Sequence, residues 1–374
     1  MKRRYDAVVI GAGLAGGAFA WALARRGRSV LLVEREARPG VHASGRNAGL
    51  VRRVEASSAI SSLSRAGAEL LAAPPADLSP SPLYRRTGSL LLARGAELPT
   101  WEAAVAEAQA AGVVVERGPA AEWTRGSGLQ AADGVAFRTP ADGVADPHEV
   151  LSAYLASARN QGTDVAFEAP ASLVVDQGRV VGVELPSGRV EAEWVVNAAG
   201  PWAADLVGAA GGLSLELQSY RRHLFYTGPL SGVPADSPWI WDLERGFYLR
   251  PESSGWLLCA CDHEPRPPED AQAVSDAQDR LAVKVSALAP DLVDHPIARA
   301  WAGLRTFAPD QRFVIGPDPR LGGLFWATGL GGHGLTTSGA VGTLGARAIC
   351  GELESNLELA PFDPGRFVLV GGES

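Results

Sequence analysis

The chain has 374 residues, of which 46% are hydrophobic, and its formal net charge is −8. This length and composition predict a globular protein with a large core and two or three domains. The sequence contains no basic run that could neutralise a phosphate backbone, which argues against a nucleic-acid partner. The three cysteines, Cys259, Cys261 and Cys350, do not form the pattern of a disulfide framework and fit a reducing compartment.

The N-terminus superficially resembles a secretory signal, because Lys2, Arg3 and Arg4 precede an apolar stretch. The glycine spacing and the charges at Arg25 and Arg26 favour a strand, a turn and a helix instead. No apolar run of roughly 18 residues follows that could span a bilayer. We therefore expect no transmembrane segment and a cytoplasmic protein, which could also attach peripherally to the inner membrane.

The first elements of the chain form a nucleotide-binding pattern. Residues 7–10 and 30–33 are short apolar runs, typical of buried parallel strands. Residues 14–26 between them predict a helix, and Gly27 provides its stop. The glycine-rich turn at 11–16 joins the first strand to this helix, which is the order of elements that binds a dinucleotide.

Each glycine of this turn has a separate expected role. Gly11 permits the tight turn, Gly13 lets the backbone approach a pyrophosphate, and Gly16 lets the helix pack close to the strand. The phosphates would bind the free N–H groups at the helix N-terminus. Glu34, at the end of the second strand, is placed to accept hydrogen bonds from the ribose hydroxyls.

A second small and polar segment follows at residues 43–49, and it favours FAD over NAD. The ribityl chain and the isoalloxazine of FAD extend well beyond the pyrophosphate and need such contacts. Ser44, Arg46, Asn47 and the backbone near Gly49 would supply them. An ordinary surface loop is the alternative interpretation of this segment.

The middle of the chain predicts further regular elements. Helices are expected at 64–73, 100–111 and 148–160, the last with Asp146 as N-cap and Pro147 in its first turn, and a strand at 89–93. A β-meander is expected near 173–184. A strand at 194–197 then enters a tight turn of small residues, which can approach the nucleotide. A further strand covers 255–261, and a helix begins near 271 and runs to 288.

A second glycine-rich helix start lies near the C-terminus. The strand at 324–328 leads into Gly329-Leu330-Gly331-Gly332-His333-Gly334, and a helix then runs to about Cys350. The positive end of its dipole suits the flavin N1 and C2 carbonyl, which gain negative charge on reduction. We therefore expect the turns at 11–16 and 329–334 to line one slot and hold the two ends of one cofactor.

These motifs together resemble the superfamily of D-amino acid oxidase, glycine oxidase and sarcosine oxidase. The resemblance covers nearly the whole chain through GAGLAG, the glutamate, ASGRNAG, VVNAAGPWA and GLGGHGLTTS, in that order. Segments near residues 220, 247 and 301 are similar to bacterial D-arginine dehydrogenase. The residues expected to contact the cofactor are Gly11, Gly13, Leu14, Ala15, Gly16, Glu34, Arg35, Ser44, Arg46, Asn47, Ala48, Gly49, Val174, Ala198, Gly200, Trp202, Gly303, Arg305, Gly331, Gly332, His333, Gly334, Leu335 and Thr336.

The resemblance implies an α/β fold with two domains. A discontinuous, Rossmann-like FAD-binding domain of the glutathione-reductase type would comprise residues 1–85, 145–215 and 306–374. An α+β substrate-binding domain with a mostly antiparallel sheet would comprise 86–144 and 216–305. The sheet of the second domain would cover the flavin.

The resemblance also implies the chemistry. A hydride would pass from the substrate Cα to flavin N5, and the resulting imine would hydrolyse to a keto acid. Arg222 and Arg305 would hold the substrate carboxylate, with a hydrogen bond from the Tyr248 hydroxyl. Arg221 could exchange roles with Arg222, because neighbours on a strand face opposite ways. His333 would contact substrate or cap the helix that follows it.

The sequence departs from the D-arginine enzyme at the substrate side. No acidic residue stands near residues 87–89 to hold a guanidinium, Leu50-Val51-Arg52-Arg53 replaces a histidine and a tyrosine, and Thr336 replaces a glutamine. The loss of an anion and the gain of cations argue against a basic substrate side chain. A neutral or acidic substrate is the expectation.

The electron acceptor is expected to be a quinone or O2. Residues 255–261 lack the lysine that helps oxygen react in sarcosine oxidases, which favours a dehydrogenase. Residues 301–313 lack a cysteine, so the FAD is expected to be non-covalent. No metal site is expected, because Cys259 and Cys261 have no partner pair elsewhere.

Three alternatives stay open at this point. The chain could be the flavin subunit of a heteromeric opine oxidase or a cyanide-forming glycine oxidase, a glycine or sarcosine oxidase, or an NAD-binding dehydrogenase. A yellow protein would exclude the last of these.

Overall fold

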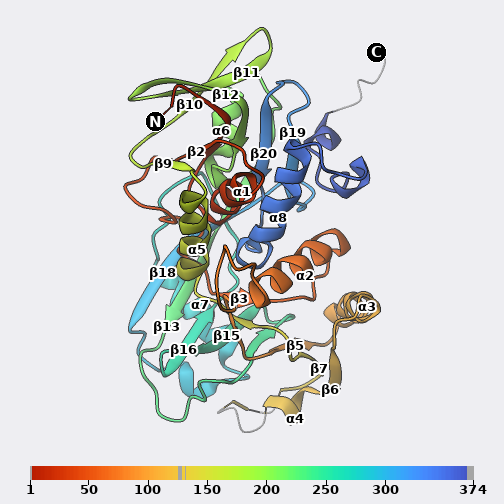
Figure 1. Ribbon diagram of the computed structural model, residues 1–374. Coiled ribbons are helices and arrows are strands. Elements are labelled where there is room, and N and C mark those ends of the chain that lie inside the picture. Colours follow the sequence, from red (N-terminus) through yellow and green to blue (C-terminus); the bar gives the residue numbers. More distant parts are fainter. Residues whose placement is uncertain (1, 125–128, 131, 369–374) are drawn as a thin grey trace, which may run out of the picture.

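The computed structural model describes residues 2–124, 129–130 and 132–368, and its strands form three sheets (Figure 1). The predicted domain segments also include residue 1, residues 125–128, residue 131 and residues 369–374, which lie outside the described residues. The first sheet and its helices occupy the upper half of Figure 1, and the second sheet occupies the lower half.

The eight-stranded sheet contains the N-terminal nucleotide-binding pattern. Its order is β10-β11-β12-β1-β2-β9, with β20 beside β12 and β19 beside β20. The central pairs are parallel, whereas the β10-β11-β12 meander and the β19–β20 pair are antiparallel. The strands are β1 (Arg4–Ile10), β2 (Val30–Val33), β9 (Asp164–Ala166), β10 (Ser172–Asp176), β11 (Arg179–Leu185), β12 (Gly188–Asn197), β19 (Val314–Pro317) and β20 (Leu324–Thr328).

Helices cover both faces of this sheet. On one face, α1, α5 and α8 pack with the sheet into a core that includes Phe19, Tyr154 and Val341. On the other face, α6 packs through Ala203 and Val207. The helices are α1 (Leu14–Ala24), α2 (Ser58–Ala72), α3 (Glu97–Ala110), α4 (Ala120–Thr124), α5 (Pro147–Asn160), α6 (Ala203–Gly208), α7 (Asp276–Val285) and α8 (Gly334–Ile349), with 3-10 turns η1 (Gly200–Trp202), η2 (Pro290–Leu292), η3 (Asn356–Glu358) and η4 (Pro364–Phe367).

The contact between α1 and α8 joins the two ends of the chain. A Cβ atom at Gly342 would lie 2.6 Å from the carbonyl carbon of Ala18, and one at Gly345 would lie 1.9 Å from the ring of Phe19. The two helices therefore approach more closely than any side chain at these positions would allow. Their N-termini consequently lie near each other.

The nine-stranded sheet forms the second half of the molecule. Its order is β17-β13-β16-β15-β14-β5-β7-β6, with β18 beside β13, and every pair is antiparallel except β14–β5. This agrees with the mostly antiparallel sheet that the sequence predicts. The strands are β5 (Ser89–Ala93), β6 (Glu116–Pro119), β7 (Val135–Thr139), β13 (Gln218–Tyr226), β14 (Trp239–Asp242), β15 (Phe247–Glu252), β16 (Gly255–Cys259), β17 (Glu264–Arg266) and β18 (Arg299–Phe307).

A small third sheet and a buried ion cluster connect the two halves. The order is β3-β8-β4, formed by β3 (Leu50–Val51), β8 (Gly143–Val144) and β4 (Arg85–Arg86). Beside it, Arg53 donates to the Ala141 carbonyl at 2.5 Å and lies 3.4 Å from the Asp142 carboxylate. Ser89 donates to the same carboxylate at 2.8 Å. Burial raises the pKa of Asp142 to about 7, despite these contacts.

Most predicted elements match the structure, and several predicted boundaries are wrong. The helix predicted at 64–73 already begins at Ser58, and the helix predicted to run to 288 ends at Val285. The strands at 30–33, 89–93 and 324–328 and the Asp146 N-cap, which accepts from the His148 N–H, are confirmed. The helix predicted from 271 begins at Asp276, because the Ala271 carbonyl and the Val274 N–H bond to the side chains of Arg46 and His223. The strand predicted to 261 ends at Cys259, because Cys261 adopts a φ of 46°.

Within the described residues, no helix combines the length and the apolar character that crossing a membrane requires.

The α1–α8 contact predicts the effect of a single added methyl group. The Gly342→Ala substitution should lower the free energy of unfolding by about 1–3 kcal/mol, because it overpacks the interface. Gly208→Ala is the matched control, since a Cβ atom there meets nothing within 4 Å. Urea denaturation measures both, and an equal effect of the two substitutions would contradict the close contact.

The buried Asp142 predicts a pH dependence of stability. Its folded-state pKa of about 7 lies above the value of an exposed aspartate, so the folded chain binds the extra proton. The contribution of Asp142 to the free energy of unfolding should therefore fall as the pH rises from about 4 to about 7. Asp142→Asn should flatten this slope in denaturation curves measured across that window, and a variant with the wild-type slope would refute the assignment.

Candidate active site

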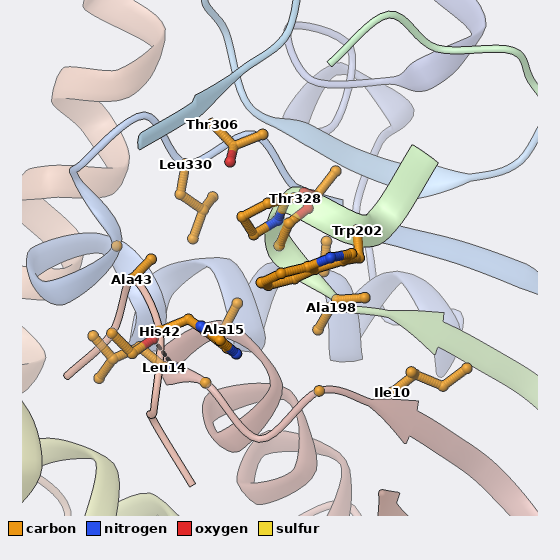
Figure 2. Close-up of a pocket in the computed structure, with 18 of the residues that line it drawn as sticks. Ile10, Leu14, Ala15, His42, Ala43, Ala198, Trp202, Thr306, Thr328 and Leu330 are labelled. Atoms are coloured by element: carbon orange, nitrogen blue, oxygen red, sulfur yellow. Dashed lines mark hydrogen bonds between the residues drawn. The ribbon is translucent and has the colours of Figure 1, made fainter. Parts of the chain in front are cut away.

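A first cavity of about 500 Å³ lies at the carboxyl ends of β1, β2, β12 and β20 (Figure 2). Ligands bind at these ends in sheets of parallel strands. Its walls combine Gly11, Gly13, Leu14 and Ala15 with residues 329–332 and 334. The two glycine-rich turns from opposite ends of the chain thus face one space.

Each of the three glycines of the first turn is required for a different geometric reason. A Cβ atom at Gly11, where φ is +104°, would lie 2.5 Å from the Ala198 carbonyl oxygen. A Cβ atom at Gly16 would lie 1.8 Å from the Gly11 carbonyl oxygen, and Gly16 lines neither cavity. Gly13 lines the cavity, and its missing Cβ would lie 2.9 Å from the Ser44 Oγ. Ser44 accepts the Leu14 N–H at 2.9 Å and so holds the start of α1.

Glu34 lies at the end of β2 and lines the cavity. Its two oxygens accept the N–H groups of Ala12 at 2.7 Å and Glu36 at 3.0 Å, which fixes the carboxylate beside the turn. Arg35 lies over the Trp202 ring, 3.7 Å from its centroid. Figure 2 shows Trp202 reaching across the cavity toward Ala15 and His42, whose ring centroid is 4.7 Å away. No motif in the sequence pointed to His42.

A second cavity of about 610 Å³ adjoins the first. The two share Asn47, Arg305, Gly331 and Gly332, which mark their junction. Its remaining walls come from several residues between Ala48 and Ile60, from Trp101, from side chains of the nine-stranded sheet and its loops, from several residues between Phe307 and Arg312, and from His333 and Thr336. A cofactor in the first cavity would therefore have a neighbouring space for a substrate.

Arg222, Tyr248 and Arg305 all line this second cavity. Arg222 pairs with Gly303 across β13 and β18, so Arg305 lies diagonally opposite it on the same face of the sheet. Arg221 faces the other way and forms an ion pair with Glu264 at 2.5 Å. This excludes the exchange of roles between Arg221 and Arg222.

The Arg305 side chain fits between two glycines. A Cβ atom at Gly332 would lie 2.9 Å from the Arg305 Cδ, and one at Gly303 would lie 3.3 Å from its Nη1. The guanidinium donates to the carbonyls of Leu304 and Arg46 at 3.1 and 3.3 Å. No carboxylate of the described residues pairs with it. Burial lowers the pKa of Arg305, yet a guanidinium keeps its charge under all ordinary conditions.

Arg222 also lacks an acidic partner among the residues that the structure describes. Its Nη2 lies 2.5 Å from Nε2 of His263, and its Nε lies 3.5 Å from the Asp262 carbonyl. Burial and the neighbouring Arg222 lower the pKa of His263, so this ring is neutral and accepts from the arginine. Burial raises the pKa of Tyr248 well above its usual value, so its hydroxyl stays protonated and can donate.

His333 and Glu55 form a pair that sequence reasoning missed. His333 stands at the N-cap of α8, but its side chain makes no capping bond and lines the second cavity instead. Its Nε2 lies 3.3 Å from Glu55. Glu55 is 3% exposed and pairs with Arg52 at 2.6 Å. Burial alone would raise the pKa of Glu55, but Arg52 and His333 hold it below its usual value.

This pair corrects the expectation that residues 52 and 53 add uncompensated positive charge to the substrate side. Arg52 lines the second cavity, but Glu55 neutralises it. Arg53 lines neither cavity and pairs with the buried Asp142 and with the exposed Glu69. Sequence spacing could not predict the ion pair between Arg52 and Glu55, because it forms only through the course that the chain takes after β3.

The other predicted contacts divide by location. The first cavity is lined by Gly11, Gly13, Leu14, Ala15, Glu34, Arg35, Ser44, Asn47, Ala198, Gly200, Trp202, Arg305, Gly331, Gly332 and Gly334. Ala48, His333 and Thr336 line only the second cavity. Six predicted contacts line neither cavity, namely Gly16, Arg46, Gly49, Val174, Gly303 and Leu335.

The structure explains why three of these six residues, Val174, Leu335 and Arg46, line neither cavity. Val174 lies within β10 and pairs with Gly182, and the residues that reach the cavity are 169–171, just before that strand. Leu335, in the first turn of α8, is 1% exposed, and its side chain packs in the hydrophobic core. The Arg46 guanidinium turns away and donates to the Ala271 and Ala302 carbonyls at 2.6 and 3.1 Å, which ties residues 43–49 to the second half of the molecule.

Gly49 and Gly303 have structural roles. Gly49 has a φ of +78°, and a Cβ atom there would lie 2.5 Å from the Ala145 carbonyl oxygen. Gly303 provides room for Arg305 and Arg46, as a Cβ atom there would lie 3.0 Å from the Arg46 Cβ. Gly303 thus shapes the junction of the cavities from outside it, whereas Gly49 allows the chain to pass close to Ala145.

Comparison with known proteins agrees with this geometry. Glycine oxidase of Geobacillus kaustophilus is 27% identical over 387 aligned positions, covering 98% of both chains. FAD-dependent oxidoreductase domain-containing protein 1 of Bos taurus is 26% identical over 48% of this chain, and the match spans only 40% of that relative. The solved structure of L-proline dehydrogenase from P. horikoshii shares the fold, with a TM-score of 0.89, 24% identity and 98% coverage of both chains.

The family comparison covers most of the chain. The sequence model of the family described as FAD dependent oxidoreductase, DAO, matches residues 6–348. The match spans both glycine-rich turns and both cavities. The chain is therefore a member of the DAO family of FAD-dependent oxidoreductases.

Proposed function

We propose that this enzyme oxidises the CH–N bond of an amino acid or a secondary amine to an imine, which water hydrolyses to a keto acid. The observation that carries this proposal is the position of Arg222 and Arg305. Both guanidiniums lack a carboxylate partner among the described residues, and both line a cavity that adjoins the dinucleotide slot. A substrate carboxylate would supply the missing counter-charge.

The residues of the first cavity fit FAD. Gly11 and Gly13 leave the backbone of the first turn bare, Glu34 is held beside it for a ribose, and the glycines of the second turn stand at the junction. No side chain at Gly331 or Gly332 blocks the passage between the cavities. When bound, FAD accepts the hydride that leaves the substrate. None of the described residues that line the first cavity is a cysteine, and we propose that FAD binds non-covalently.

The residues of the second cavity would orient the substrate. Arg305 stands at the junction and would bind the carboxylate through its fork, with Arg222 beside it and a hydrogen bond from Tyr248. The substrate amine must be neutral to react, so its proton has to leave first. Glu55 and His333 already pair with each other, and we assign this proton to solvent.

A dehydrogenase that passes electrons to a quinone is the form of the activity that we propose, with D-amino acids as the first candidates. No lysine lines either cavity among the described residues, so an oxygen-activating ammonium group of the sarcosine oxidase kind has no equivalent there. A quinone acceptor would require contact with the inner membrane from the cytoplasm. Glycine oxidase is the second candidate, because the relative from Geobacillus kaustophilus aligns over 98% of both chains.

The first turn predicts the cost of a methyl group in the cofactor slot. Gly13→Ala should weaken FAD binding by about 100-fold or more, because its Cβ atom enters the space beside Ser44 and the phosphate path. Fluorescence titration of the apoprotein with FAD measures the change. Gly208→Ala should bind FAD as the wild type does, and unaltered affinity of Gly13→Ala would refute this role.

The arginine at the junction predicts a loss of substrate binding. Arg305→Gln should lower kcat/KM for amino acids by about 10²–10³-fold, mainly through KM, whereas FAD stays bound. Anaerobic bleaching of the flavin across a panel of amino acids and N-methyl amino acids provides the assay. Bleaching by none of them would remove the proposed function, and rapid reoxidation by air would favour an oxidase.

A further inference from the structure

We infer that the substrate carries a large, neutral and apolar side chain, aromatic rings being the best fit, and that the far end of the second cavity receives it. The inference rests on the proposed function, because it assumes that Arg222 and Arg305 hold the substrate carboxylate.

The far end of the second cavity is built from large apolar residues. The walls that it does not share with the first cavity include Leu50, Ile60, Trp101 and Trp241. None of these four residues lines the first cavity, so a cofactor bound there does not account for them. Ligand pockets are typically lined in this way where the ligand itself is apolar.

Aromatic rings connect the carboxylate-binding residues to this far end. The Tyr248 and Trp241 rings meet edge to face, with centroids 5.9 Å apart and planes at 73°. Trp241 then meets Trp101 at 6.2 Å and 61°. A side chain that extends from a carboxylate at Arg305 and Arg222 would thus lie along a row of ring edges and faces, which favours an aromatic substituent.

The charged residues of the same walls neutralise one another. Arg52 pairs with Glu55 at 2.6 Å, and its guanidinium lies over the Trp241 ring, 4.8 Å from the centroid. Arg312 pairs with Asp310 at 2.8 Å. Among the described charged residues of these walls, only Arg222 and Arg305, which would bind the substrate carboxylate, lack an acidic partner. An acidic or basic side chain would lose its hydration here without gaining a counter-ion.

Glu55 is the positioning residue in this arrangement. It is buried, accepts from Ser64 at 3.2 Å as well, and holds Arg52 against the Trp241 ring. Its charge also cancels that of Arg52. Removing this one charge would therefore leave the far end net positive without removing any apolar wall.

The test compares amino acids by anaerobic reduction of the bound flavin in the holoenzyme. Phenylalanine, tryptophan and leucine, each as both enantiomers, are compared with glycine, alanine, aspartate, glutamate, lysine and arginine. For the productive enantiomer, we expect kcat/KM of phenylalanine to exceed that of alanine by about tenfold or more, since each added methylene in an apolar pocket is worth about that much. Charged amino acids should fall below their neutral counterparts of similar size.

Two substitutions test the role of the far end. Glu55→Gln should raise kcat/KM of glutamate relative to phenylalanine by about tenfold, because it uncovers the charge of Arg52. Glu69→Gln is the matched control, since Glu69 pairs with the neighbouring Arg53 outside the cavity and should leave the ratio as in the wild type. Trp241→Leu should reduce the ratio of kcat/KM for phenylalanine to kcat/KM for alanine. This second test does not depend on any change at Glu55.

The outcomes separate this inference from the proposed function. Flavin reduction by glycine or by charged amino acids at least as efficiently as by phenylalanine would overturn the inference and leave the proposed function standing. An unaltered glutamate-to-phenylalanine ratio in Glu55→Gln, with the variant folded and holding FAD, would also overturn it. Failure of every amine to reduce the flavin would instead reject the proposed function.

Discussion

The contact between α1 and α8 is the constraint on which the site depends. Gly342 and Gly345 let α8 lie against Ala18 and Phe19 of α1, so the N-termini of helices from opposite ends of the chain meet at one cavity. Each N-terminus carries unpaired N–H groups and a partial positive charge. Because backbone rather than side chains forms this surface, a long anionic cofactor can lie along it. The substrate side is then placed by the sheet that joins the slot at Arg305.

The pattern of the first turn could be predicted from sequence because its strand, glycines and helix follow one another directly along the chain. The strand at 30–33 follows from its apolar run. Of the contacts that the glycines make, that of Gly16 with the Gly11 carbonyl is local, whereas Gly11 meets Ala198 and Gly13 meets Ser44. Val174 and Leu335 line neither cavity, because strand registry and helix rotation decide whether a residue faces a cavity, and neither is encoded in spacing. The Arg46 guanidinium turns toward carbonyl groups that lie more than 200 positions away in the sequence.

The substrate side required the structure for a related reason. Arg52 and Arg53 are adjacent in sequence and look alike as two added cations, but Glu55 neutralises one in the cavity and Asp142 and Glu69 receive the other outside it. The two arginines that matter are those without an acid, and a missing partner among the described residues is visible only in three dimensions. The net charge of a site depends on which charged side chains pair with each other. Counting arginines along a motif therefore overestimated the positive charge on the substrate side.

A calorimetric titration of the apoprotein with FAD and with ADP tests whether the two glycine-rich turns hold one cofactor. ADP is long enough to reach only the first turn, whereas FAD would span both. We expect one site per chain for each ligand, mutual exclusion, and FAD affinity higher by about 100-fold or more, because the second turn adds its own contacts. Simultaneous binding of both ligands, or equal affinity for the two, would show that the turns do not hold one cofactor.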